Sequence, residues 1–305
     1  MFKHLLVPLD GSRLAEAALP AAAYLASTLG ASVTLVHFIE RDAPQEVHGD
    51  RHLTHPDDAS RYLDHIAQSA FPAGLHVERH VHTAEIEDVA GCILDHVGEL
   101  RPDLIVMCTH GRGGLRSILL GTLAQKVVSQ GTTPVVLIRP TARERADSFG
   151  IRVLLVPLDG NPSHEQGLPV ASELARTCAA KVHLVLVVPT VRTLSGHHAA
   201  TGVLLPGATT AMLDLVQKDA EGYLERNLIQ LQARGIAGTA EICRGDPTTA
   251  IVAAATRAGA DLIVLGTHGK AGMDAFWSGS VGPKVSSRSR SPLLLVPIPE
   301  PDVGD

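Results

Sequence analysis

The chain has 305 residues, of which 45% are hydrophobic and 19% charged, so it can fill a core in each of about two domains and is too apolar for a disordered protein. A formal net charge of −6 and an aromatic content of 3% argue against the basic patches and stacking platforms of nucleic-acid-binding proteins. No apolar run approaches the roughly 20 residues of a membrane-spanning helix.

Strand-like and helix-like segments alternate along the first half of the chain. Residues 5–9 form a continuous apolar run, as buried parallel strands do. Apolar residues then recur at helical spacing over 12–29, and Gly30 is placed to end that helix. The same criteria predict the later elements, which are strands at 33–39, 77–83, 104–108 and 135–138 and helices at 57–70 and 88–99.

The second half of the chain repeats the first. The sequence LLVPLDG occurs at 5–11 and again at 154–160, and DLIVMCTHGRGG at 103–114 returns as DLIVLGTHGKAG at 261–272. Such a repeat predicts one domain duplicated in tandem, with a long amphipathic helix near 211–234 in the second copy. We expect the boundaries 1–140 for the first domain, 141–150 for a polar linker and 151–298 for the second domain.

Alternating βα units with apolar strands predict an open, doubly wound parallel sheet in each domain. In the strand order 3-2-1-4-5, the order reverses between strands one and four, and ligands of such sheets bind there, beyond the carboxyl ends of the strands. The PLDG segment follows strand one and the THG segment follows strand four. Both motifs therefore point to the same crevice in each domain.

The loop after strand four of the second copy has the pattern of a phosphate-binding loop. Gly266-Thr267-His268-Gly269 is followed, nine residues later, by Gly279-Ser280 at the start of a helix predicted over 280–290. Glycine allows close approach of the backbone, and amide groups at a helix N-terminus bind anions. The alternative is that these glycines only form turns and that Ser280 only caps the helix.

This glycine pattern, together with VPLDG, resembles the universal stress protein family, and the resemblance covers almost the whole chain twice. It implies two Rossmann-like (adenine nucleotide alpha hydrolase-like) domains, each with a five-stranded parallel sheet, and ATP bound with Mg²⁺ or Mn²⁺. Carried onto the second copy, it implies that Gly266 and Gly269 approach the ribose and phosphates and that Gly279 and Ser280 hold the outer phosphates. The other residues that it implies near the nucleotide are Pro157, Leu158, Asp159, Val187, Gly245, Thr267, His268, Lys270 and Val281.

The first copy departs from the family pattern. Cys108 replaces the first glycine, Glu87 stands in place of Gly245, and Phe38 stands where the second copy has Val187. A carboxylate that faced the site would repel phosphate, and the larger side chains would narrow it. Asp10, Gly111, Gly121 and Thr122 remain. We therefore expect one competent nucleotide site, in the second copy, and a weakened or repurposed site in the first. Asp10 and Asp159 also suit a plain turn-capping role.

Histidines gather on the predicted strand 77–83 of the first copy. Alternation places His76, Glu78, His80 and His82 on one face of this strand. Imidazoles at alternate positions can bind zinc, and His80 and His82 are the candidate ligands, with Glu78 or a histidine of the insert after strand two completing the set. The alternative is a polar edge strand with no metal, since no named zinc signature is present.

The predicted function is that of an ATP-binding stress-response sensor. A slow metal-dependent ATPase and a ligand-binding or zinc-binding module built on the first copy are the alternatives, and no dedicated catalytic group stands out. The four scattered cysteines favour reduced thiols in the cytoplasm over disulfides in a secreted chain. The resemblance also implies that the strand-five edges pair the two copies into an internal pseudo-dimer, which can dimerise again.

Overall fold

The computed structural model describes residues 1–43, 46–47, 49–109, 122–140, 149–191, 193, 206–268 and 281–298. The first half consists of β1 (His4–Pro8), α1 (Arg13–Glu16), α2 (Leu19–Leu29), β2 (Ser32–Glu40), β3 (Glu46–Val47), β4 (Asp50–Arg51), α3 (Pro56–Ser69), β5 (Val77–Ile86), α4 (Val89–Leu100), β6 (Leu104–Cys108), α5 (Thr122–Gln130) and β7 (Val135–Ile138).

The described residues of the second half repeat this plan. It consists of β8 (Val153–Leu158), the 3₁₀ turn η1 (Pro162–His164), α6 (Gly167–Cys178), β9 (Lys181–Val188), α8 (Pro206–Ala233), β10 (Gly238–Arg244), α9 (Pro247–Ala258), β11 (Leu262–His268), α11 (Val281–Arg288) and β12 (Leu293–Ile298).

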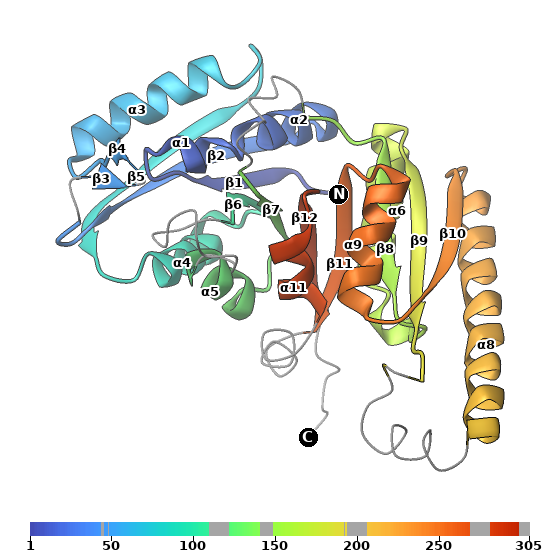
Figure 1. Cartoon of the computed structure of the whole chain (residues 1–305). Helices are drawn as coiled ribbons and strands as arrows, with labels where there is room; N and C mark the ends of the chain where they lie inside the picture. Colours follow the sequence, from blue (N-terminus) through green and yellow to red (C-terminus); the bar gives the residue numbers. More distant parts are fainter. Residues whose placement is uncertain are drawn as a thin grey trace, which may run out of the picture.

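Ten strands form one continuous sheet in the order β10-β9-β8-β11-β12-β7-β6-β1-β2-β5 (Figure 1). Within each half the order is 3-2-1-4-5 and all pairs are parallel, as the sequence predicts. The halves join where β7 and β12 pair antiparallel, with Val136 opposite Leu294. Both side chains are buried, so the predicted strand-five pairing forms a seam inside the protein.

Helices cover both faces of this sheet, as in other doubly wound folds. Helices α2, α3, α6 and α8 pack on one face, and α4, α5, α9 and α11 pack on the other. On each face a single cluster of buried side chains contains residues of both halves: Leu5 and Leu154 belong to one cluster, and Leu6 and Leu155 to the other. The two copies therefore share their cores as well as their sheet.

Several element boundaries differ from the prediction. The helix expected over 12–29 is divided into α1 and α2, with Pro20 in the first turn of α2, where its missing N–H costs little. Gly30 ends α2 in the left-handed conformation as expected, with φ +61°. Strand β5 continues to Ile86 rather than 83, and the pairing with β2 shifts between Phe38 and Glu40.

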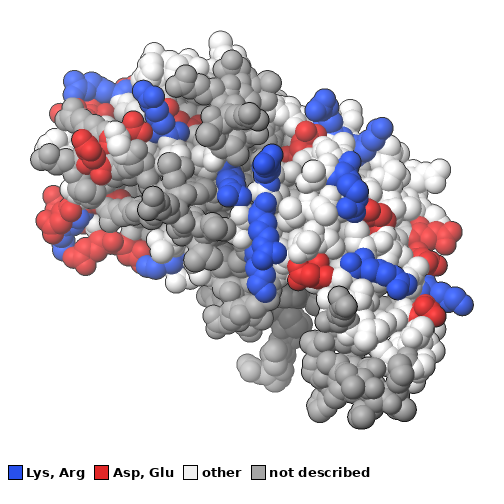
Figure 2. Space-filling view, viewed as in Figure 1, with Lys and Arg blue, Asp and Glu red and all other residues white. Residues whose placement is uncertain are grey.

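None of the helices in the described ranges combines the length and the hydropathy that a membrane span requires. On the face shown in Figure 2, lysine and arginine side chains are interspersed with aspartate and glutamate, without a broad basic field among the residues coloured. This distribution agrees with the slightly negative net charge.

Candidate functional site

A cavity of about 210 Å³ lies in the first half at the carboxyl ends of β1, β2 and β6. This is the point where the strand order reverses, because β1 lies between β2 and β6 in the sheet. The first turns of α4 and α5 close its other side. Its wall is formed by Pro8, Leu9, Asp10, Ala15, His37, Phe38, Glu40, His52, Glu87, Asp88, Val89, Ala90, Ile93, Met107, Cys108, Thr122, Leu123 and Lys126.

Two of the residues expected to obstruct this cavity are buried in its wall. The Cys108 thiol donates a hydrogen bond to the carbonyl oxygen of Leu14, with 2.8 Å between sulfur and oxygen. Burial, and then the charge of Asp10, raise the pKa of this thiol well above its ordinary value. Phe38 is 5% exposed and packs against His82 and His96. Both side chains occupy space where the second half has smaller residues.

Carboxylates predominate on the wall of the first-half cavity. Glu87 lies in the wall and pairs with Arg41 at 2.5 Å, and Asp88 lies 3.4 Å from the ammonium group of Lys126. The Asp10 carboxylate accepts a hydrogen bond of 2.8 Å from the backbone N–H of Ser12, which is a turn-capping role. An excess of carboxylates disfavours a phosphate group in this cavity.

In the second half, the residues that follow β8 form a similar turn. Asp159 accepts a hydrogen bond of 2.9 Å from the backbone N–H of Asn161, and its other oxygen lies 2.5 Å from Nδ1 of His164. Pro157 and Leu158 end β8 and are half-buried. Asp159 therefore makes a turn-capping hydrogen bond, and its side chain, 56% exposed, lies at the carboxyl edge of the sheet.

The second half carries smaller residues at the positions of Glu87, Phe38 and Cys108. Gly245 has φ +117°, and a Cβ built there meets no atom within 4 Å. Val187 is half-buried on β9, at the strand position that Phe38 occupies on β2. Gly266 lies on β11 next to Gly167, where a Cβ on Gly167 would lie 3.2 Å from the Gly266 nitrogen. The missing side chain of Gly167 thus permits close packing of α6 on β11 at Gly266.

Much of the predicted phosphate loop lies outside the described residues. This applies to Gly269, Lys270, Gly279 and Ser280 in the second half and to Gly111 and Gly121 in the first. Thr267 and His268 are described as part of the β11 backbone, which pairs with β12. Thr122 and Val281 are the first residues of α5 and α11, so the helix expected after each loop is present.

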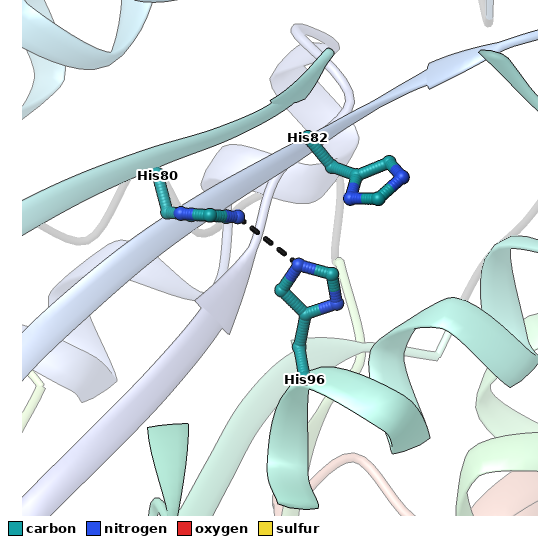
Figure 3. Close-up of side chains that lie close together, drawn as sticks. All are labelled: His80, His82 and His96. Carbon is teal, nitrogen blue, oxygen red and sulfur yellow. Dashed lines mark hydrogen bonds between the residues drawn. The ribbon is translucent and has the colours of Figure 1, made fainter. Parts of the chain in front are cut away.

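The structure brings His80 and His82 together with a residue that the sequence prediction missed. Both side chains extend from β5 toward α4, where His96 meets them (Figure 3). The predicted partner Glu78 is elsewhere: it pairs with His76 at 3.0 Å in solvent. His52 of the insert contacts His37. His96 could have been found as a histidine at helical spacing with Ala90 and Ile93 on the buried face of α4.

Comparison with known proteins decides the family. The sequence model of the universal stress protein family matches the chain twice, over residues 1–139 and 150–297. The chain belongs to the universal stress protein family. A universal stress protein of Mycolicibacterium smegmatis is 26% identical over 96% of this chain and 96% of its own length. Universal stress protein Rv2623 of Mycobacterium tuberculosis is 26% identical, with 95% of each chain aligned.

Solved structures share the tandem fold of this universal stress protein. A universal stress protein from Archaeoglobus fulgidus aligns with 97% of this chain and 96% of its own, with a TM-score of 0.68 and 18% identity. A protein of unknown function from Pseudomonas aeruginosa, PA1789, aligns with 97% and 93%, with a TM-score of 0.67 and 17% identity. At this identity the likeness establishes the fold, with two universal stress protein domains in one sheet.

Proposed function

We propose that this universal stress protein binds ATP with Mg²⁺ or Mn²⁺ in the crevice of its second half and acts as a nucleotide-dependent sensor in a stress response. The contrast between the two crevices carries the proposal. In the first half, Cys108, Phe38 and Glu87 line the cavity. In the second half the corresponding residues are Gly266, Val187 and Gly245, and the space beside Gly245 is open.

The described part of the second crevice suits the nucleoside end of ATP. Val187 offers a half-buried apolar surface for the adenine ring. Asp159, the carboxylate that directly follows β8, would line the adenosine side of the nucleotide. The predicted loop residues Gly269, Lys270, Gly279 and Ser280 would hold the phosphates.

A cytoplasmic location is part of this proposal. All four cysteines are free thiols, which suits a reducing compartment.

Isothermal titration calorimetry of the full chain with ATP and Mg²⁺ tests the proposal. We expect one site per chain, and we expect Gly279→Val to abolish binding. Val187→Phe introduces the residue of the first half, and it should weaken binding by about tenfold or more because it fills the adenine surface. The reciprocal variant Phe38→Val is the control, since it alters only the other crevice.

Each remaining outcome of the titration contradicts part of the proposal. Two sites per chain would show that the first crevice tolerates Cys108, Phe38 and Glu87. Equal affinity of Val187→Phe and wild type would remove Val187 from the site. No binding by folded protein, freed of bound nucleotide, would overturn the proposal.

A further inference from the structure

Three imidazole rings meet between β5 and α4 in the first half. Each ring contributes one nitrogen, and the three nitrogens, of His80, His82 and His96, lie within 4.8 Å of one another. Nε2 of His80 and Nε2 of His96 are 3.0 Å apart, and the three rings converge on a common point (Figure 3). Nitrogens bound to one tetrahedral zinc at about 2.05 Å lie about 3.3 Å apart, so small side-chain rotations suffice to bring all three to one ion.

The hydrogen bonds of His96 leave the correct nitrogen available. Its Nδ1 lies 2.9 Å from the carbonyl oxygen of Cys92, one turn earlier on α4. Because a carbonyl only accepts, Nδ1 carries the hydrogen and the neutral ring presents the lone pair of Nε2 to the other histidines. Zinc-binding histidines typically donate their second N–H to a carbonyl or carboxylate in this manner. His96 is 4% exposed, so this orientation is fixed by packing.

The surroundings of the three rings favour a bound cation. The charges that act on the group are carboxylates: Glu99 acts on His80, and Asp95, Glu99 and Asp88 act on the adjacent Cys92. Phe38 packs edge-on against His96, with 5.2 Å between ring centroids, and shields this side from the cavity.

The second half carries a different group at the same three positions. Val36 pairs with His80 and its counterpart Val185 pairs with Glu241, while Phe38 pairs with His82 and its counterpart Val187 pairs with Cys243. The helical position of His96 is held by Ala254. Arg257, at the helical position of Glu99, bonds to Glu241 at 2.8 Å. In the second half an ion pair therefore occupies the space between strand and helix. The three histidines occur at these positions only in the first half.

We propose that His80, His82 and His96 bind one Zn²⁺ ion, with the fourth coordination position open to water or a small anion. Two of the imidazoles lie two residues apart on β5, and the third lies on the facing helix α4. Together they leave one position of a tetrahedral ion without a protein ligand. Structural zinc sites normally have four protein ligands, whereas sites that activate water or bind an exogenous ligand have three. This site uses none of the residues proposed to bind ATP.

Metal titration of the chelator-treated full chain tests the zinc site. We expect one Zn²⁺ per chain by calorimetry and a higher Tm with zinc, since binding to the folded state stabilises it. His80→Asn and His96→Gln should each lower zinc affinity by at least about tenfold, because loss of an outer hydrogen bond to a ligand already has this effect. His76→Asn is the matched control: His76 precedes the same strand but pairs with Glu78 in solvent.

Cobalt substitution tests the open position. Co²⁺ at the site should give the visible bands of a four-coordinate ion, and azide should shift them by replacing the water. Circular dichroism and apo-protein Tm values establish that each variant folds; His80→Asn is the milder one because His80 is only half-buried.

The remaining results would overturn the proposal. No stoichiometric zinc binding would show that the three rings form only a hydrogen-bonded cluster. Equal affinity of wild type and both folded variants, or equal losses in the control, would place zinc at a surface histidine. Cobalt bands that azide leaves unchanged would refute the open fourth position.

Discussion

A Cβ atom on Gly167 would lie 3.2 Å from the backbone nitrogen of Gly266, so α6 and β11 touch where both lack side chains. The corresponding pair in the first half is Ala18 and Cys108, both buried, and there the Cys108 thiol bonds to the helix carbonyl of Leu14. At the corresponding place the first half has larger residues, and β6 is bonded there to α1.

Gly167→Ala should destabilise the protein. The added methyl group meets backbone rather than a flexible side chain, so α6 has to move from β11, and overpacking of this kind costs about 1–3 kcal/mol. Urea unfolding followed by circular dichroism measures the change. Gly222→Ala, in the middle of α8, is the control: its Cβ meets only the end of Arg226 at 3.5 Å, and it should stabilise the helix by up to about 1 kcal/mol. Equal effects of the two variants would contradict the packing argument.

Asp246, the N-cap of α9, should make the free energy of unfolding depend on pH. Its carboxylate accepts hydrogen bonds from the hydroxyl of Thr249 at 2.6 Å and from its backbone N–H at 2.9 Å, and these bonds lower the pKa of Asp246. Because the pKa is lower in the folded state, the ionised carboxylate stabilises the protein at pH values above the unfolded-state pKa of about 3.9. This stabilisation is lost as the pH falls through the folded-state pKa.

Two variants separate the charge of Asp246 from its capping role. Asp246→Ala should cost about 0.5–2 kcal/mol at neutral pH. Asp246→Asn keeps a capping oxygen without the charge, so its stability should fall less than that of wild type between pH values of about 5 and 3. Parallel urea titrations across this range measure both. Identical acid profiles for wild type and Asp246→Asn would show that the charge contributes nothing.

Leu294→Ala should weaken the seam between the halves. Leu294 is 0% exposed and lies on β12, opposite Val136 of β7 in the antiparallel pair. Its truncation leaves a cavity and costs about 2–5 kcal/mol. Ile229→Ala on α8 is the control, because Ile229 is 59% exposed. Thermal unfolding should show a lower Tm for the seam variant only. A loss no larger than that of the control would mean that the seam relaxes around the substitution.

Cys108 should be the slowest thiol to react with an alkylating reagent. Burial raises the pKa of Cys108, and the thiolate is the reactive form. Cys92, Cys178 and Cys243 are only half-buried. Mass spectrometry of the native protein near neutral pH should show alkylation at these three first, and Cys108→Ser should leave their labelling unchanged. Early labelling at Cys108 would show that α1 opens readily.

Local patterns in the sequence suffice to predict the duplicated fold. Most strands of the repeat are apolar runs, and the helices carry apolar residues at helical spacing. The alternation, the order 3-2-1-4-5 and the strand-five pairing therefore follow from local patterns and the family resemblance. The positions of Cys108, Phe38 and Glu87 in the first crevice also follow, because residues after strand ends must meet at the carboxyl edge of a parallel sheet.

The contacts between side chains of different elements could not be predicted from the sequence. The sequence placed His80 and His82 on one face of β5 but assigned Glu78 or an insert histidine as partner, whereas packing of α4 on that face brings His96 to them. The close approach of Gly167 and Gly266 has the same origin. Periodicity fixes the face on which a side chain lies, but the neighbour of that face is set by how helices dock on the sheet, and this depends on contacts between residues far apart in the chain.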